Sequence, residues 1–201
     1  MKEYQYEEML NINTAGEQQG YPRSLHYHPY EPTPYSALEA LFSRYEVKRT
    51  DRVVDFGCGK GRLSFFIHYY CQANVVGVEM NETFYQDALK NRSCYKKRNQ
   101  AGTIEFYQGL AQEYPINPHD NRFYFFNPFS LKIFIQTVQN ILVSLERYFR
   151  KVELILYYST EEYMFYLDNN TPFELKKEIP LPGLNSKDPY ERFLIYSLPY
   201  L

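Results

Sequence analysis

The chain has 201 residues, of which 44% are hydrophobic and 23% are charged. This length and composition fit one domain with a full hydrophobic core and exclude wholesale disorder. The formal net charge of −2 gives no general attraction to nucleic acids or anionic membranes. The net charge does not reveal a local basic patch, so nucleic acid stays a possible but disfavoured partner.

The cysteines and the N-terminus indicate the compartment. Cys58, Cys71 and Cys94 form no CxxC pair, so we expect free thiols and no structural zinc or other metal. The first residues, MKEYQYEEML, lack the basic flank and apolar run of a signal peptide. No apolar run is long enough to span a bilayer. We therefore expect a cytoplasmic protein without a membrane partner.

The first 32 residues are expected to form an irregular arm or lid, and residues 33–201 the domain proper. Pro29, Pro32 and Pro34 exclude a helix until Ser36 can serve as its N-cap. Apolar residues then recur at helical spacing over 37–47, which predicts an amphipathic helix.

Strands and helices alternate after residue 51, which predicts an α/β fold with a mostly parallel sheet and helices on both faces. The expected strands are 52–56, 74–80, 103–109, 122–127 and 152–159, and the expected helices are 61–71, 82–99 and 131–149. Two further strands, 172–181 and 191–200, have no helix between them. We expect them to close the sheet at its edge as an antiparallel hairpin, giving seven strands.

A glycine-rich loop follows the first of these strands, in the segment VVDFGCGKGRLSFF. Ligands of open parallel sheets bind beyond the carboxyl ends of the strands. Gly57, Gly59 and Gly61 permit positive φ and remove side chains where a ligand approaches the backbone. The helix that follows offers unpaired amide N–H groups and the positive end of its dipole.

Two common glycine loops do not match. A phosphate-binding loop places Ser or Thr after Gly-Lys and a glycine five residues earlier. This chain has Gly61 and Val54 at those positions. A dinucleotide fingerprint needs a glycine where Arg62 stands.

The remaining pattern, Asp55-x-Gly57-x-Gly59-x-Gly61, resembles the glycine motif of class I S-adenosylmethionine-dependent methyltransferases. The resemblance covers the order of elements from about Tyr30 to the C-terminus. It implies a Rossmann-like sheet and S-adenosyl-L-methionine as the cofactor. In that family the residue corresponding to Asp55 organises the loop and approaches the methionine portion; capping of the loop amides or of the following helix is the alternative. Cys58 lies inside the loop and is expected at the cofactor as a small, packable residue.

Two further segments would complete the cofactor site. Glu79 ends the second strand about 20 residues after the loop, where a carboxylate can accept both ribose hydroxyls; a solvated strand end is the alternative. By the resemblance, Leu110 and Ala111 border the adenine after the third strand, and Gln112 hydrogen-bonds the base edge.

The fourth strand ends in Asn127-Pro128-Phe129, which resembles the Asn/Asp-Pro-Pro-aromatic signature of amino-methylating enzymes. In those enzymes the Asn side chain and the proline carbonyl accept hydrogen bonds from the target amino group, and the aromatic ring stacks on its plane. This chain has one proline fewer. A strand-ending turn is the alternative interpretation. Similar segments also occur in a group of small bacterial methyltransferases, with a looser likeness to Dot1-type lysine methyltransferases.

Three other features receive weaker interpretations. Tyr30, Thr33 and Tyr35 could cover the methionine end of the cofactor or the acceptor, or pack in a proline-fixed loop. The cluster of Lys and Arg at residues 90–98 is expected to be a solvated helix end rather than a phosphate-binding surface. His26 and His28 lack a third ligand for a metal.

We therefore expect a methyltransferase that uses S-adenosyl-L-methionine, with Asn127, Pro128 and Phe129 at the acceptor. Two alternatives stay open: a non-catalytic binding or regulatory module, and an RNA or DNA methylase. The sequence names neither the acceptor nor the oligomeric state.

Overall fold

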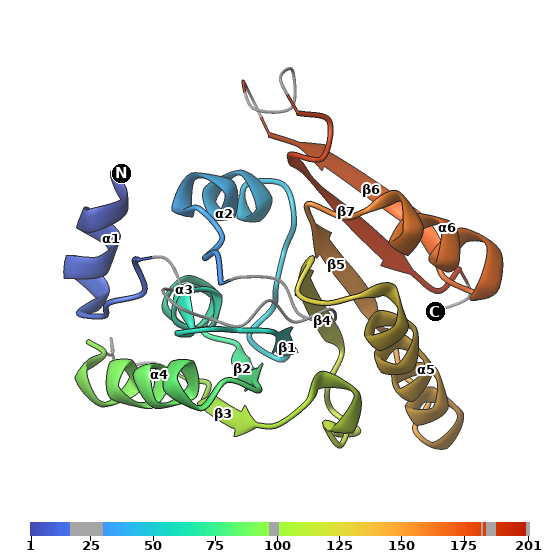
Figure 1. Ribbon diagram of the computed structural model, residues 1–201, viewed down its shortest axis with the longest axis horizontal. Coiled ribbons are helices and arrows are strands. Elements are labelled where there is room, and N and C mark those ends of the chain that lie inside the picture. The colour runs from blue at the N-terminus through green and yellow to red at the C-terminus, as the bar shows by residue number, and fades with distance from the viewer. Residues whose placement is uncertain (17–29, 97–100, 182, 184–187, 200–201) are drawn as a thin grey trace.

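The computed structural model describes residues 1–16, 30–96, 101–181, 183 and 188–199. Within these residues, seven strands form one sheet in the order β3-β2-β1-β4-β5-β7-β6 (Figure 1). The first five pair in parallel, whereas β7 is antiparallel to β5 and β6. The predicted fold class is confirmed. The strands are β1 Arg52–Phe56, β2 Asn74–Glu79, β3 Ile104–Gln108, β4 Arg122–Phe126, β5 Glu153–Tyr157, β6 Glu174–Pro180 and β7 Arg192–Ser197.

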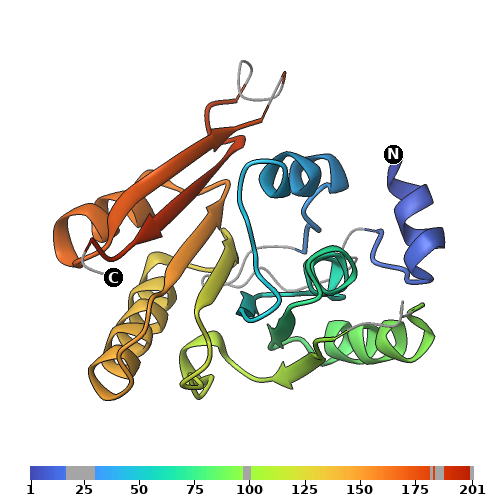
Figure 2. The same ribbon diagram turned by 180° about the vertical axis from the view of Figure 1, so that it is seen from behind.

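Helices cover both faces of the sheet and leave the N-terminal helix and the C-terminal hairpin at opposite ends of the molecule (Figures 1 and 2). Buried residues of α1, α2 and α3 belong to the core on one face, and those of η1, α5 and α6 to the core on the other. The helices are α1 Glu3–Leu10, α2 Tyr35–Phe42, α3 Arg62–Cys71, α4 Glu82–Cys94, η1 Ala111–Glu113, α5 Leu131–Arg147 and α6 Glu161–Asn170.

The expectation of an irregular N-terminal arm is wrong for residues 3–10, which form α1. Tyr6 and Leu10 stand four residues apart, so they share one helix face, and both are buried. Tyr6 stacks on Tyr35 of α2 with ring centroids 4.3 Å apart. The helix ends at Asn11, whose left-handed φ of 54° is typical of a C-cap. The domain boundary at residue 32 stays a prediction.

Three other helices differ from the prediction. Helix α4 ends at Cys94 rather than at residue 99, because Tyr95 has a non-helical ψ of 127°, and α2 ends at Phe42 rather than at residue 47. Helix α2 begins at Tyr35, one residue before the proposed Ser36 cap, because Pro34 serves as the N-cap and its carbonyl accepts bonds from Ala37 and Leu38. Helix α6 was not predicted. Its signals are the Thr160 hydroxyl, which accepts a bond from the Tyr163 amide, and the acidic first turn that follows Thr160.

The register brings the ends of the parallel strands to one edge. Phe56 at the end of β1 pairs with Val78 of β2 and Phe125 of β4, and Phe126 pairs with Tyr157 of β5. The loops that follow β1, β2 and β4 therefore begin side by side. Along the described part of the chain, we find no helix of the length and apolarity needed to cross a membrane.

Candidate functional site

The glycine loop connects β1 to α3 in a conformation that favours glycine. Gly57, Gly59 and Gly61 have φ values of 78°, 53° and 88°. L-residues with side chains rarely adopt these values, so the predicted conformational need for glycine is confirmed. The amides of Gly57 and Cys58 both donate to the carbonyl of Val78, at 2.9 and 3.1 Å. The loop is thereby attached to the end of β2.

The space beside the glycines is occupied by the protein itself. A Cβ on Gly57 would lie 2.7 Å from Cβ of Pro128, and one on Gly59 would collide with the Tyr30 ring. A Cβ on Gly61 would meet Phe106 at 2.8 Å. Close packing against Pro128, Tyr30 and Phe106 is thus a second reason for glycine at these positions, and the approach of a ligand to the loop backbone stays a prediction. The amides of Gly57, Cys58, Gly59 and Gly61 all donate to acceptors within the protein, at 2.8 to 3.1 Å, so these bonds fix the path of the loop.

Glu79 is a buried bridge between two loops rather than a solvated strand end. Its side chain is 7% exposed, and its two oxygens accept bonds from the amides of Gly59 and Asn81, each at 2.8 Å. Burial raises the pKa of Glu79, and the bonds from the backbone amides oppose that rise. Each carboxylate oxygen keeps a second lone pair, so the ribose-binding role remains available and stays a prediction.

Asp55 is a buried carboxyl on the face of β1 covered by α3. It is 4% exposed, and burial, followed by the charge of Glu79, raises its pKa to about 8. Within the described residues it accepts no hydrogen bond from the loop amides. The proposed capping of the loop or of α3 by this carboxyl is therefore wrong. Asp55 pairs in register with Tyr124 of β4, whose hydroxyl lies 2.8 Å from the Thr33 hydroxyl.

Cys58 is a packing residue, as the sequence indicated. It is 7% exposed, and its sulfur fills the space over Gly77, where a Cβ would lie 2.6 Å from Sγ. Burial raises the pKa of this thiol well above its ordinary value, which disfavours the nucleophilic thiolate. All three cysteines are free.

The loop after β3 reaches the same edge. The Gly109 amide donates to the carbonyl of Glu79 at 3.0 Å, which places Leu110 and Ala111 next to the end of β2. In the adjoining turn of η1, Oε1 of Gln112 is buried and accepts no hydrogen bond from the described residues. A buried acceptor without a donor is costly, so this atom suits a ligand that brings an N–H group.

Asn127 and Pro128 lie at the loop, but Phe129 does not. Asn127 has a left-handed φ of 37°, and Pro128 contacts Gly57 as described above. The Phe129 ring is 2% exposed and packs edge-on against Phe125, with centroids 6.2 Å apart. The expectation that this ring stacks on an acceptor is therefore wrong, because its faces are covered by the core.

The sequence interpretation missed Tyr158, which lies beside Asn127. Both residues follow paired strand ends, and Tyr158 also has a left-handed φ, 52°. Its hydroxyl donates to Asp188 at 2.6 Å, and that of the preceding Tyr157 donates to Glu191 at the same distance. Non-glycine residues with positive φ concentrate at functional sites. The signal available in the sequence was a pair of tyrosines at the end of β5.

Arg62 is a second residue beside the loop that the sequence interpretation did not include in the site. It served there only to exclude a dinucleotide loop, yet its side chain is 6% exposed and contacts the N-terminal segment through Glu3 and Thr14. Tyr30, Thr33 and Arg62 thus lie together over the glycine loop and the buried face of β1. A lone arginine at the start of an apolar helix was the available signal.

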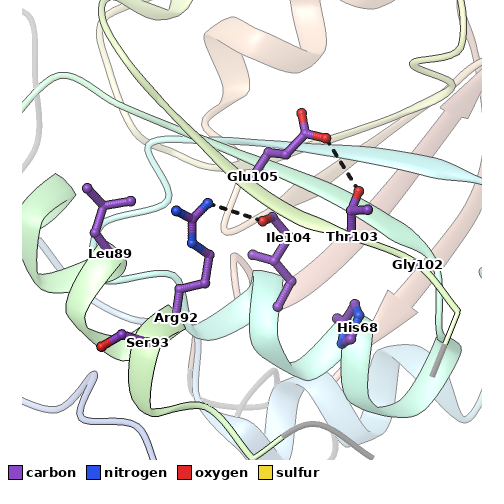
Figure 3. A pocket seen from close by; sticks show the side chains of 8 residues that line it. All are labelled: His68, Leu89, Arg92, Ser93, Gly102, Thr103, Ile104 and Glu105. Carbon is purple, nitrogen blue, oxygen red and sulfur yellow. Dashed lines mark hydrogen bonds between the residues drawn. The ribbon is translucent and has the colours of Figure 1, made fainter. Parts of the chain in front are cut away.

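A cavity of 540 Å³ lies elsewhere, at the amino end of β3 (Figure 3). Arg92 from α4 faces the first residue of β3 across it and donates to the Ile104 carbonyl at 3.5 Å. None of the predicted site residues lines the cavity, so it is separate from the glycine-loop edge. Its lining is His68, Leu89, Arg92, Ser93, Gly102, Thr103, Ile104 and Glu105.

Two features lie partly or wholly outside the described residues. His26 and His28 are outside them, as are Lys97 and Arg98 of the basic cluster. Among the side chains that are described, no three His, Cys, Asp or Glu residues gather to hold a metal ion.

The chain is similar to known methyltransferases in sequence. A family model described as a methyltransferase domain matches residues 48–162, more than half of the chain. An uncharacterised methyltransferase of Schizosaccharomyces pombe (strain 972) is 30% identical over 105 residues. That alignment covers 50% of this chain and 37% of the yeast protein, so the chain spans just over a third of this relative's length.

Solved structures share the fold at low sequence identity. An RNA methyltransferase from Salinibacter ruber, crystallised with S-adenosyl-L-homocysteine, has a TM-score of 0.56 and 17% identity over 85% of this chain and 95% of that one. Phosphoethanolamine N-methyltransferase 1 from Haemonchus contortus, in complex with phosphoethanolamine and S-adenosylhomocysteine, has a TM-score of 0.60 and 13% identity over 83% and 43%. A protein of the NADB-Rossmann superfamily from Streptococcus agalactiae has a TM-score of 0.56 and 17% identity over 83% and 68%. The chain therefore belongs to the methyltransferase domain family and has the class I, Rossmann-like fold of S-adenosylmethionine-dependent methyltransferases.

Proposed function

We propose that this protein transfers a methyl group from S-adenosyl-L-methionine to an amino group. The observation that carries the proposal is the contact between Gly57 and Pro128. In this contact the glycine loop lies directly against the strand-four segment that resembles the acceptor motif of amino-methylating enzymes. Donor and acceptor can therefore meet at one edge of the sheet.

The residues present at that edge fit the cofactor. The Glu79 carboxylate, held by two backbone amides, would accept the ribose hydroxyls. The buried Oε1 of Gln112 would accept a bond from the adenine amino group, which gives this atom the donor that it lacks. The buried Asp55 carboxyl would lie near the methionine portion, where a positive charge would favour its ionised form.

The protein's part in the reaction is mainly positioning. S-adenosyl-L-methionine supplies a methyl group that is already strongly electrophilic, so the chain needs no residue to activate it. Asn127 and the Pro128 carbonyl would hold the acceptor nitrogen in line, and the buried surroundings of Asp55 and Glu79 would exclude water. The left-handed backbone at Asn127 supports this role, because it directs the residue away from the regular strand path.

Charges near Asn127 favour an amine over a nucleic acid. The neighbouring tyrosines at the end of β5 are bonded to Asp188 and Glu191, whose carboxylates would repel a phosphate backbone. Arg92, the residue of the basic cluster that lines the cavity, lies at the opposite edge of the sheet. The S. ruber neighbour keeps an RNA or DNA methylase as the second candidate.

The expected cellular location and binding partners are part of this proposal. We propose a cytoplasmic location, no membrane partner and an acceptor that is not a nucleic acid. The non-catalytic alternative would bind the cofactor without methyl transfer.

Two measurements test the proposal. Calorimetry with S-adenosyl-L-methionine and S-adenosylhomocysteine should show binding of both, and no binding of either at millimolar concentration would refute it. Transfer of labelled methyl groups should then be measured to small amines, a lysine-rich protein, RNA and DNA. Labelling of an amine or of lysine is expected. Labelling of RNA or DNA alone, with affinity that falls steeply in salt, would instead support the nucleic-acid methylase. Cofactor binding without labelling of any acceptor would support the non-catalytic module.

A further inference from the structure

Arg62 is the first residue of α3, directly after the glycine loop, and its guanidinium is almost completely buried. It is 6% exposed and contacts two separate N-terminal segments. Its Nε donates to the Thr14 hydroxyl at 2.8 Å and its Nη1 to Glu3 at 2.6 Å. A buried charge is tolerated only when it is fully paired, so this arginine requires those segments to be in place.

The second segment is the proline-fixed stretch before α2. Nη1 of Arg62 also lies 3.3 Å from the carbonyl of Thr33, and the guanidinium carbon is 4.5 Å from the centroid of the Tyr35 ring. Nη2 lies 3.5 Å from Glu7, which also accepts a bond from the Tyr35 hydroxyl. One side chain therefore fastens residues 3–14 and residues 33–35 to the start of α3.

The fastened segments hold Tyr30 on the glycine loop. The Tyr30 hydroxyl donates to the carbonyl of Thr14 at 2.7 Å, so Thr14 is bonded to both Tyr30 and Arg62. The Tyr30 ring lies directly against Gly59 and packs on Phe84 of α4, with centroids 4.7 Å apart. Lys60 lies 5.6 Å from the same ring and donates to the Ala15 carbonyl at 3.1 Å.

The far end of this chain of contacts lies beside the predicted ribose site. Gly59, which Tyr30 covers, donates its amide to Glu79. The other segment reaches the buried face of β1, because the hydroxyls of Thr33 and Tyr124 are 2.8 Å apart. The N-terminal segments thus cover the cofactor loop from above Gly59 to the face that carries Asp55.

We propose that Arg62 is a positioning residue that holds residues 3–14 and 30–35 over the cofactor loop, with Tyr30 as a wall of the cofactor site. The proposal rests on the proposed function, since it assigns a role to the same site. Arg62 touches the N-terminal segments and not the reacting atoms, so it acts through Tyr30. Its effect is on how long the cofactor stays bound, because the cover must move for the cofactor to exchange.

The test uses the full chain and follows dissociation of S-adenosylhomocysteine in rapid-mixing experiments. In Tyr30→Phe the ring stays and only the bond to Thr14 is lost, so dissociation should be about fivefold faster, as the loss of one hydrogen bond implies. Arg62→Met keeps an aliphatic chain of similar length without the bonds, and a larger acceleration, of about tenfold or more, is expected. The matched control is Arg44→Met, since Arg44 is exposed at the end of α2; its rate should equal that of the unaltered protein.

Hydrogen exchange distinguishes a role at the cofactor site from a purely structural one. Coupling between sites is reciprocal, so bound S-adenosylhomocysteine should slow amide exchange in residues 3–10 of the unaltered protein, and this protection should disappear in Arg62→Met. Tyr30→Phe carries the test by itself if Arg62→Met does not fold.

The outcomes separate this inference from the proposed function. If the unaltered protein does not bind S-adenosylhomocysteine, the proposed function fails. Suppose that it binds, that both variants release the ligand at the rate of the unaltered protein, and that amide exchange in residues 3–10 is the same with and without the ligand. Only the role of Arg62 is then overturned. Tighter binding by Tyr30→Ala would also overturn it, because the ring would then compete with the cofactor.

Discussion

Pro128 lies directly against Gly57, so that a Cβ on Gly57 would approach Cβ of Pro128 to 2.7 Å. These residues are far apart in the sequence, but β1 and β4 are neighbours in the sheet and end at the same edge. The contact joins the loop that resembles a methyl-donor motif to the loop that resembles an acceptor motif.

Substitution of Gly57 should therefore lower the free energy of unfolding by more than the strained backbone conformation alone accounts for. Gly57→Ala meets both a φ of 78° and Pro128, whereas Gly183 has the same φ with nothing within 4 Å of its Cβ position. We expect Gly183→Ala to lower the free energy of unfolding by about 1 kcal/mol and Gly57→Ala by several times more. Urea denaturation measures both. Equal losses of unfolding free energy in the two variants would show that Pro128 moves aside without an energetic penalty.

Glu79 should contribute to cofactor affinity through its charge. Glu79→Gln keeps one acceptor oxygen but loses the carboxylate, and we expect affinity for S-adenosylhomocysteine to fall by about tenfold to a hundredfold, as loss of a charged hydrogen bond implies. Calorimetry measures the dissociation constant. Glu82→Gln, on an exposed residue in the first turn of α4, is the control and should bind normally. Unchanged affinity in Glu79→Gln would exclude the ribose role.

Asp55 should make stability depend on pH. Burial, and then the charge of Glu79, raises its pKa to about 8 in the folded protein. An unfolded aspartate has a pKa of about 3.9. The folded protein therefore binds this proton more tightly, so the contribution to stability is full below about pH 4 and is lost as pH rises to about 8.

Asp55→Asn tests this relationship because the amide stays neutral at every pH. Urea midpoints measured between pH 5.5 and 8.5 should fall with rising pH in the unaltered protein and fall less in Asp55→Asn. Glu82→Gln should follow the unaltered protein. If the Asp55→Asn midpoints fall in parallel with the unaltered ones, another group carries the dependence.

Asn127 should affect turnover more than cofactor binding. Its φ of 37° suits glycine, so Asn127→Gly removes the amide without straining the backbone. We expect kcat to fall by about tenfold to a hundredfold, while the dissociation constant of S-adenosylhomocysteine changes little. Steady-state kinetics on the acceptor found by the labelling panel, together with calorimetry, separate the two. Full kcat in Asn127→Gly would reduce Asn127 to a strand-ending turn.

Tyr163 should stabilise the strand-four loop from the core side. Its hydroxyl donates to the carbonyl of Phe129, so Tyr163→Phe leaves a buried acceptor without its donor. We expect a loss of about 1–3 kcal/mol in the free energy of unfolding. Tyr166→Phe on the same helix is the control, since this hydroxyl bonds to no described residue. Equal stability of the two variants would contradict the assigned bond.

Local signals in the sequence were sufficient for most of the fold. The strands from β1 to β5 were predicted because each is an apolar run bounded by turn residues, and glycines at three alternate positions indicated positive φ. Helix α1 was missed because its short apolar stripe, with Tyr6 and Leu10, lies within a largely polar segment. Helix α6 was missed although the Thr160 cap and its acidic first turn are visible in the sequence.

The site was predicted less completely than the fold. The sequence indicated that Asp55, Glu79 and Asn127 follow or end neighbouring strands, and the register brings those strand ends to one edge. It did not indicate that Phe129 turns into the core, because the direction of a side chain after a strand depends on what packs against it. An aromatic residue suits both a hydrophobic core and a ligand-binding surface, so the residue type does not distinguish the two.

By itself, the sequence determined the order of elements, the glycine loop and the family to which the chain belongs. These properties follow from periodicity and from backbone conformations that only certain residues adopt. Only the tertiary structure decided that Tyr30 covers Gly59, that Pro128 fills the space beside Gly57, and that Arg62 binds Thr14 from 48 positions away. Such contacts depend on the packing of distant segments around buried charges and rings, for which the local pattern of residues carries no signal.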